Sequence, residues 1–321
     1  MIVRLGYVAI AKNLGKKVTS SSTVTFTNYN KINTEEKKIE KLRSVTLSNL
    51  NALQEIIKYN IKNNIHFYRI TSALIPLVTH PEVGYWGHRE IFKNDFKYIG
   101  KLIKESKMRV DTHPDEFNVI NSINPKVVEN SAMNLMRQVE WFEDFDYEEG
   151  KMVIHVGGKT GGKEEGLERF IKNFRELPIK IKSRIIVEND DKTYTAKETL
   201  EICKILNIPM VLDVHHHNCN NNGEKIEDML EDILNTWNSE KLPPKLHFSS
   251  PRDGEKDRKH SDFINSKDFV DFIEKAKKFN RDFDVMLECK EKDIALIQLV
   301  KDVNEINSKY KWIDESSFYY K

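Results

Sequence analysis

Six apolar, β-like segments of this chain run directly into a residue that can bind a divalent metal ion. These residues are His113, His155, Glu188, Asp213, His247 and Glu288, and consecutive members lie about 25 to 42 positions apart. This spacing matches the length of one β/α unit. In a (β/α)8 barrel all strand ends meet at one mouth, where the active site lies. The pattern therefore predicts such a barrel with a polynuclear metal centre.

The whole chain alternates between β-like segments and segments of helical periodicity. The expected strands are 2–8, 65–71, 108–113, 152–156, 184–189, 209–214, 245–249 and 284–289. The expected helices are 36–63, 89–106, 125–144, 166–177, 195–207, 225–237, 267–279 and 291–309. Asn33-Thr34-Glu35-Glu36 and Asn265-Ser266 are typical helix starts. The predicted fold class is α/β, a single-domain TIM barrel over residues 1–321.

Composition places this barrel among well-hydrated proteins. The formal net charge is +1 and 31% of residues are charged, which argues against indiscriminate coating of nucleic acid. Cys203, Cys219 and Cys289 form no C-x-x-C pattern, so neither a disulfide framework nor a zinc ribbon is indicated. The first residues do not resemble a signal peptide, and no apolar run reaches the ~18–20 residues that span a bilayer. We expect a cytoplasmic protein without membrane association.

Three of the predicted βα connections are longer than a compact barrel requires. They comprise residues 9–33, 72–88 and 250–266. Loops of this length are usually functional or disordered, and all three would lie on the same face as the ligand residues. The mixed-charge run Arg252–Lys259 is typical of a solvated loop, but its position just before His260 also allows contact with a phosphate.

Imidazole and carboxylate groups suit Zn²⁺, Mn²⁺ or Fe²⁺. Glu188, Asp213 and Glu288 can bridge ions, whereas imidazoles are terminal ligands. The terminal candidates are His113, His155, His216, His247 and His260. The neighbouring His215 and His217 are not among the predicted ligands. Each would either support a ligand side chain or face solvent. Any one of these histidines alone would more often be a hydrogen-bonded structural residue. A metal-binding residue at each of six successive strand ends, however, favours a metal site.

Lys245 does not fit this pattern. Side chains alternate along a strand, so Lys245 and His247 both point into the barrel. A buried ammonium beside several cations is electrostatically unfavourable. Three interpretations remain open: the side chain points elsewhere, it is neutral, or it has reacted with carbon dioxide to form an anionic carbamate ligand.

At these residues the chain resembles the UV damage endonuclease family, which is related in fold and metal arrangement to endonuclease IV. The resemblance covers roughly residues 1–290. The motifs that carry it are Arg4-Leu5-Gly6-Tyr7, Thr79-His80-Pro81, His113-Pro114, His155-Val156-Gly157-Gly158, Glu188-Asn189-Asp190, Asp213-x-x-His216-His217, Lys245-Leu246-His247, His260 and Val285-Met286-Leu287-Glu288.

The resemblance implies a TIM barrel with up to three divalent ions, typically manganese, for which zinc or magnesium could substitute. It implies that the metal ligands are His113, His155, Glu188, Asp213, His216, His247, His260 and Glu288, with His80 beside them as a ligand or a supporting residue. It also implies that Lys245 is the carboxylated lysine (N6-carboxylysine). Glu188, Asp213, Lys245, His247 and Glu288 are then the expected catalytic residues.

The same resemblance implies how DNA is recognised. The expected substrate is double-stranded DNA carrying UV lesions, nicked immediately 5′ to cyclobutane pyrimidine dimers, 6-4 photoproducts or abasic sites, with no obligatory protein partner. Tyr7 and Asn13 match residues that line the lesion pocket. Family members often carry a Gln-Tyr probe after the His-Pro motif, whereas this chain has Glu116-Phe117. Phe117 keeps an aromatic wedge. Glu116 lacks the amide donor, which puts lesion preference in doubt.

Two other functions fit parts of the pattern. A metal-dependent sugar isomerase uses the same barrel with carboxylates and histidines at its strand ends, but it needs only two ions and no aromatic wedge. A non-catalytic damage-binding protein would have no need for eight metal ligands. Aldose turnover without nicking would select the first, and lesion binding without cleavage would select the second.

Overall fold

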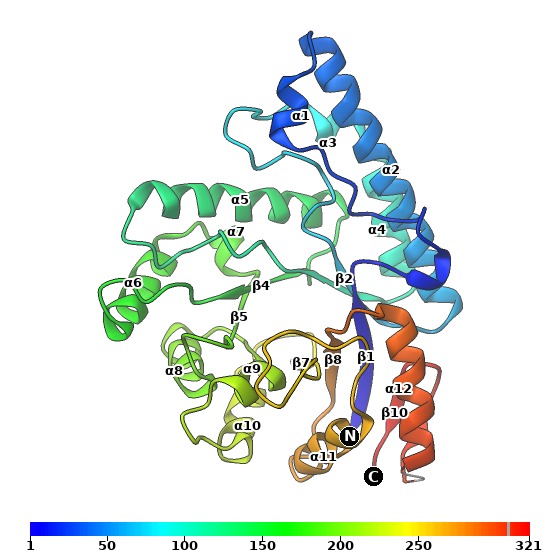
Figure 1. The fold of residues 1–321 in the computed structure, drawn as a ribbon, viewed down its shortest axis with the longest axis vertical. Helices are drawn as coiled ribbons and strands as arrows, with labels where there is room; N and C mark the ends of the chain where they lie inside the picture. The colour runs from blue at the N-terminus through cyan, green and yellow to red at the C-terminus, as the bar shows by residue number, and fades with distance from the viewer. Residues whose placement is uncertain (307–308) are drawn as a thin grey trace.

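A computed structural model of the chain, which describes residues 1–306 and 309–321, shows a closed (β/α)8 barrel (Figure 1). Within the described residues, eight parallel strands form its wall. They are β1 (Ile2–Val8), β2 (Phe67–Ile70), β3 (Arg109–Thr112), β4 (Lys151–His155), β5 (Ile185–Glu188), β6 (Met210–Asp213), β7 (Lys245–Phe248) and β8 (Phe283–Leu287). Each strand pairs with the next in sequence, and β1 pairs with both β2 and β8 to close the barrel.

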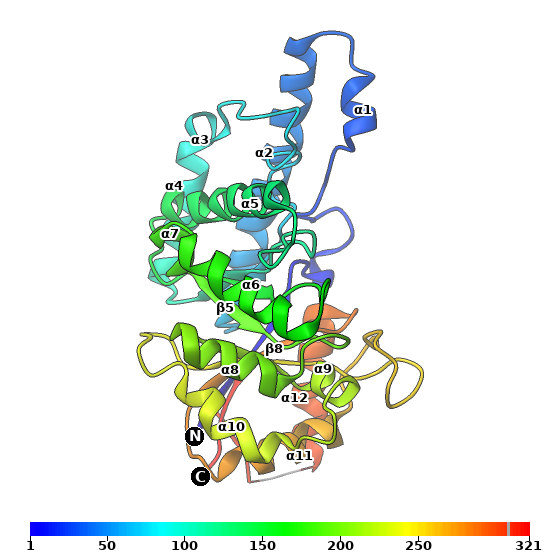
Figure 2. The same cartoon turned by 90° about the vertical axis from the view of Figure 1, so that its left-hand side faces the viewer.

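Helices surround this wall and continue above it. They are η1 (Lys12–Leu14), α1 (Phe26–Asn30), α2 (Glu35–Lys62), α3 (His88–Ile91), α4 (Lys93–Glu105), α5 (Pro125–Asp144), α6 (Lys163–Glu176), α7 (Ile179–Lys182), α8 (Ala196–Leu206), α9 (Val214–Cys219), α10 (Ile226–Asn235), α11 (Ser266–Lys277) and α12 (Lys292–Ile306). In both views α1 and the start of α2 extend beyond the rest of the molecule (Figures 1 and 2). No helix among the described residues is both long and apolar enough to cross a membrane.

The expected elements agree with this structure to within a few residues. The helix expected over 89–106 is divided into α3 and α4, and residues 307–308 of the helix expected over 291–309 lie outside the described residues. Both expected helix starts are confirmed. The Thr34 side chain accepts a hydrogen bond from the backbone of Lys37, and Asn265 caps α11 in the same way.

The C-terminal segment adds a feature that the sequence pattern did not predict. The short strands β9 (Lys311–Trp312) and β10 (Ser317–Tyr319) form an antiparallel pair. β10 also pairs with the first half of β1, whereas the second half of β1 pairs with β2. The three-residue strand β10 therefore fills the gap where β1 and β2 separate at the bottom of the barrel.

The interior of the barrel is divided between apolar and charged side chains. Val153, Ile186 and Val211 form a small buried cluster with Trp237. The interior also holds buried charged residues, which are Arg69, Arg109, Asp111, Lys245 and Asp284. The larger apolar core lies between the strands and the surrounding helices. Charged side chains therefore lie inside the barrel, beneath its mouth, as well as in the loops around the mouth.

Candidate metal centre

The metal-ligand candidates meet at the carboxyl ends of the strands. His155, Glu188 and Asp213 are the last residues of β4, β5 and β6. Strand register places His155 beside Glu188, and Asp213 beside His247. His113 and Glu288 directly follow β3 and β8. The residues predicted from six distant segments therefore share one rim.

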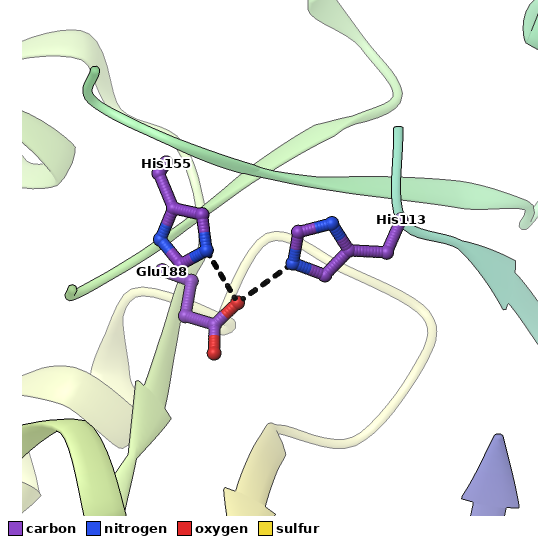
Figure 3. A group of neighbouring side chains, drawn as sticks. All are labelled: His113, His155 and Glu188. Carbon is purple, nitrogen blue, oxygen red and sulfur yellow. Dashed lines mark hydrogen bonds and ion pairs between the residues drawn. The ribbon is translucent and has the colours of Figure 1, made fainter. Parts of the chain in front are cut away.

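Glu188 lies at the centre of this group, with its side chain only 1% exposed. Its Oε2 atom lies 3.1 Å from His113 Nε2 and 3.7 Å from His155 Nε2 (Figure 3). Its Oε1 atom lies 2.7 Å from His247 Nδ1 and 3.4 Å from His216 Nδ1. One carboxylate therefore contacts four imidazoles.

Three sets of side chains could each hold one ion, and Glu188 belongs to all of them. The sets are His113, His155 and Glu188; Glu188, Asp213 and His216; and Glu188, His247 and Glu288. Within each set the ligand atoms lie within 4.8 Å of one another. A carboxylate shared by three sets is the geometry of a bridging ligand in a cluster of divalent ions.

The chemistry of these donors fits such ions. Asp213 Oδ1 accepts a hydrogen bond from the backbone of His216 at the start of α9. Asp213 Oδ2 is buried and has no hydrogen-bond partner in the part of the chain that the structure describes. It lies 3.8 Å from His216 Nδ1 and 4.0 Å from His247 Nδ1. A buried carboxylate oxygen without a partner is costly, and a cation held there would remove that cost.

The electrostatics of the cluster favour charged carboxylates. Burial alone would raise the pKa of Glu188, but the attraction of His247 and His155 outweighs it and holds this pKa well below its usual value. Burial would likewise raise the pKa of Glu288, yet Arg69 and His247 lower it well below the ordinary range. Ionised carboxylates are the form that binds metal.

In His216, by contrast, the nearby carboxylates shift the pKa upward. Burial lowers its pKa, but the nearby Asp213 and Glu188 carboxylates raise it more, to about 9. Without metal this imidazole therefore carries a proton that an ion would have to displace.

Arg69 is a central residue that the sequence pattern did not reveal. It lies on β2, is 5% exposed, and donates one hydrogen bond to Glu288 Oε1 (2.5 Å) and one to His247 Nε2 (2.6 Å). Its planar guanidinium fixes two ligand side chains at once. The signal that could have revealed it is a charged residue inside an otherwise apolar strand.

Lys245 points into the barrel, as strand alternation predicts, and is fully buried. Its ammonium group forms an ion pair with Asp111 and lies 5.4 Å from the centre of the Phe67 ring. Burial lowers the pKa of Lys245 to about 7, although the Asp111 carboxylate raises it. The structure therefore supplies an anionic partner that the sequence reasoning did not consider.

His260 and His80 lie outside the three metal-ligand sets found among the described residues. His260 donates from Nδ1 to the backbone carbonyl oxygen of Glu288 at 2.5 Å, and its ring centre lies 6.3 Å from that of His216. The His80 ring instead stacks on Phe26, with 3.8 Å between the ring centres. His260 is thus next to the cluster, whereas His80 belongs to the loop layer above it.

His215 and His217 are buried rather than solvated. His217 Nε2 bonds the backbone oxygen of Glu224 at 3.1 Å, and His215 packs beside Cys219. Both support the short helix α9, which presents His216 to the cluster.

Tyr7, for which the resemblance implies a place in the lesion pocket, lies beneath the protein surface in this structure. This residue is fully buried, its hydroxyl donates to Asn60 Oδ1 in α2 at 2.7 Å, and its ring lies 5.4 Å from that of Tyr68. Arg4 contacts Asp284 inside the barrel, so alternation along β1 turns Tyr7 outward toward the helices. In this structure the Tyr7 side chain therefore faces α2.

The other candidate lesion-contacting residues lie in exposed loops. Glu116 is exposed and Phe117 is 58% exposed, in the connection that follows β3. Phe117 also borders a cavity of about 560 Å³, which this connection, α5 and the connection that follows β2 enclose. The Asn13 amide donates to Asp293 Oδ2 at 2.9 Å, which ties the β1 loop to α12.

Known proteins resemble this chain over nearly its whole length. Residues 3–320 match the family model described as UV-endonuclease UvdE. A UV DNA damage endonuclease of Bacillus mycoides (strain KBAB4) is 39% identical over 307 residues, which is 95% of this chain and 96% of the relative. The crystal structure of SacUVDE matches with a TM-score of 0.83 and 35% identity, covering 95% of this chain and 99% of that chain.

More distant structures share the barrel alone. Endonuclease IV from Thermus thermophilus matches with a TM-score of 0.53 and 15% identity, covering 79% of this chain and 95% of that one. A D-tagatose 3-epimerase-like protein matches with a TM-score of 0.51 and 16% identity, covering 78% and 93%. At such identities the likeness to an epimerase carries no support for sugar chemistry.

Proposed function

The chain belongs to the UV-endonuclease UvdE family and is a DNA repair nuclease, and we propose that it nicks duplex DNA immediately 5′ to UV photolesions. The cut would leave a 3′-hydroxyl and a 5′-phosphate, at cyclobutane dimers, 6-4 photoproducts and abasic sites, in the cytoplasm. The observation that carries this proposal is the position of Glu188, which joins three potential ion sites at the mouth of the barrel.

The residues that would hold up to three divalent ions, manganese first among them, are His113, His155, Glu188, Asp213, His216, His247 and Glu288. His260, next to Glu288, is the eighth candidate. Bound ions would act as Lewis acids, which neutralise charge on the phosphodiester and activate water for attack. Zinc or magnesium could take their place.

The protein's own contribution is to hold these donors in position. Arg69 fixes Glu288 and His247 from below, and the backbone of α9 fixes Asp213 from the side. Because these contacts are buried or partly buried, they hold the donors in place before the substrate arrives.

Lesion selection would come from the loops above the cluster. Phe117 is an exposed aromatic side chain able to enter a duplex and fill the gap left by extruded bases. A pyrimidine dimer stacks poorly, so bending and extruding it costs less than extruding intact bases. Asn13 and Glu116 are the other proposed lesion-contacting residues.

Lys245 is proposed to be carboxylated in the metal-loaded enzyme. Its neutral Nζ would attack carbon dioxide, form an N–C bond and release one proton, giving a carbamate. The support is the family resemblance together with the inward direction of Lys245, two residues before His247. Electron density at Lys245 in crystals grown with Mn²⁺ and bicarbonate tests this, and density for an unmodified lysine would refute it.

The decisive experiment for the function uses supercoiled plasmid with and without UV irradiation. We expect nicking of irradiated plasmid only, abolished by a chelator and restored by Mn²⁺. Equal nicking of both plasmids would refute lesion specificity. Lesion binding without nicking at any divalent ion would instead indicate a damage-binding protein. A 5′-labelled duplex with one defined dimer then locates the cut and identifies its end groups.

A further inference from the structure

A strongly cationic cavity of about 450 Å³ lies against the Glu288 side of the metal centre. The basic residues lining it are Arg69, Arg252, Arg258, Lys259, Lys290 and Lys292. Among the described residues, Glu288 is the only acidic one in its lining. Because Glu288 also belongs to a metal-ligand set, an occupant of this cavity would lie directly beside the metal cluster.

The walls of this cavity are joined by backbone contacts. The long loop between β7 and α11 projects from the barrel mouth (Figure 2, gold). Lys290 N–H donates to Ser261 O at 3.1 Å, and Glu291 N–H donates to Asp262 O at 3.0 Å. The His260 ring adds its bond to the Glu288 carbonyl oxygen. The loop is therefore fastened to the connection between β8 and α12.

Some of the cations in the lining are already neutralised. Arg69 is paired with Glu288, and Arg258 with Asp191 at 2.5 Å. Arg252 is likewise paired, with Asp253 at 2.7 Å.

The three lysines have no such partner. Within the described part of the chain, Lys259, Lys290 and Lys292 have no side-chain hydrogen bond or ion pair. Lys292 is half-buried and has a backbone φ of 52°, an uncommon conformation for a residue other than glycine. The Glu288 carboxylate attracts Lys292 without a direct contact. Three lysines without a direct anionic contact around one cavity favour an anionic occupant.

We propose that this cavity binds a backbone phosphate of the nicked DNA strand, namely one of the two that flank the scissile phosphate. This inference rests on the proposed nuclease function and adds a binding residue, Lys292, to it. Phosphate contacts set the position of a protein along a strand without reading its sequence. Lys292 would therefore hold the strand in register with the metal cluster rather than take part in bond cleavage.

The test combines a protein change with a matched change in the DNA. Single-turnover nicking of a duplex with one defined dimer is measured in Mn²⁺ for wild type, Lys292→Met and Lys292→Arg. Each flanking phosphate is replaced in turn by an uncharged methylphosphonate. Lys301→Met is the matched control, because Lys301 is exposed and lies on the same helix, about 13 Å further along it.

We expect Lys292→Met to raise the enzyme concentration that gives half-maximal rate about tenfold, with the maximal rate changed little. For Lys292→Met, the slope of log affinity against log salt concentration should be less steep than for wild type by about 0.9. The methylphosphonate at the contacted position should weaken binding by wild type and by Lys292→Arg, but cause no further loss in Lys292→Met.

Two outcomes separate the possible failures. If wild type nicks the dimer duplex but the effects of Lys292→Met and of both methylphosphonates multiply, the phosphate site is refuted and the nuclease function stands. If wild type does not nick the lesion duplex at all, the proposed function itself fails. An effect of Lys301→Met equal to that of Lys292→Met would also refute a specific site.

Discussion

Lys245 and Asp111 form an ion pair in the barrel interior, and each lies two residues before a metal-ligand candidate in the sequence. Lys245 precedes His247 on β7, and Asp111 precedes His113 at the end of β3. Side chains two apart on a strand face the same way, so the pair forms a charged layer directly beneath the cluster. The Asp111 carboxylate therefore balances the charge of the Lys245 ammonium group.

Replacing Asp111 with asparagine should therefore destabilise the metal-free protein. Lys245 is fully buried and Arg69 Nε lies 3.6 Å from Asp111, so two buried cations would lose a counter-charge. Breaking a buried pair in this way costs about 3–5 kcal/mol. Urea unfolding measures the change. Asp146→Asn, which breaks an exposed pair with Lys104, is the control and should change stability little.

The same variant tests carboxylation of Lys245. A carbamate would carry the same charge as Asp111, so Asp111→Asn would relieve repulsion in the metal-loaded, bicarbonate-treated protein. We expect its destabilising effect to shrink or reverse under those conditions. An undiminished effect would show that the ammonium pair persists.

Glu188→Gln should lower manganese binding more than any other single ligand change. Glu188 belongs to all three ligand sets, whereas Glu288 belongs to one. We expect Glu288→Gln to weaken one ion selectively, and Glu188→Gln to weaken all of them and reduce nicking by at least about 100-fold. Metal content after dialysis provides a readout independent of activity. Glu231→Gln, on the exposed face of α10, should bind metal like wild type.

Phe117→Ala should reduce the preference for damaged over intact duplex by about tenfold or more, since stacking on a base contributes about 1–3 kcal/mol. Stability should hardly change, because Phe117 is 58% exposed. Competition binding with dimer-containing and intact duplexes measures the preference. Tyr98→Ala, an exposed aromatic on α4, is the control. An unchanged preference would remove Phe117 from lesion recognition.

Glu116→Gln should strengthen binding to DNA about two- to fivefold at low salt, because an exposed carboxylate near phosphates repels them. The gain should disappear at high salt, where exposed charges are screened. Fluorescence anisotropy at several salt concentrations measures this. A gain independent of salt would point instead to an amide hydrogen bond, and no gain would place Glu116 away from the backbone.

His88 should make stability depend on pH. It is fully buried against Trp86, and neither ring nitrogen has a hydrogen-bond partner among the residues described. Burial, aided by Arg137 and Arg89, lowers its pKa to about 4. The unfolded chain, with an ordinary pKa near 6.5, binds more protons between these values. Stability is therefore lost as pH falls from about 6.5 toward 4, by about 3 kcal/mol.

His88→Phe removes this titration. The difference in unfolding free energy between wild type and His88→Phe, measured in metal-free protein from pH 7 to pH 4.5, should therefore change with pH. Parallel profiles for the two proteins would contradict the assignment.

The strand-end residues could be predicted because they follow apolar β-like segments at regular intervals. His155, Glu188 and Asp213 end their strands as expected, since parallel strands all direct their carboxyl ends to one rim. The long βα loops were also recognisable from their polar composition. Their detailed placement was not, because the stacking of His80 on Phe26 depends on loop conformations that no periodicity encodes.

Strand alternation could also have identified the buried aspartates that the sequence pattern did not reveal. Asp111 and Asp284 are charged positions two and four residues before His113 and Glu288, so the alternation used for Lys245 would have placed them inside as well. The same rule, applied to Arg4, would have directed Tyr7 outward. The hairpin of β9 and β10 was beyond reach, because strands of two and three residues leave no measurable period.

The pairing of β1 has a consequence for how this chain is made on the ribosome. β1 is translated before the other strands of the barrel, whereas its neighbours β8 and β10 follow only after the other barrel strands. Until they emerge, β1 presents backbone amides and carbonyls that other nascent chains could bind. Chaperone protection of the early chain would therefore matter more for this protein than for one built from local contacts.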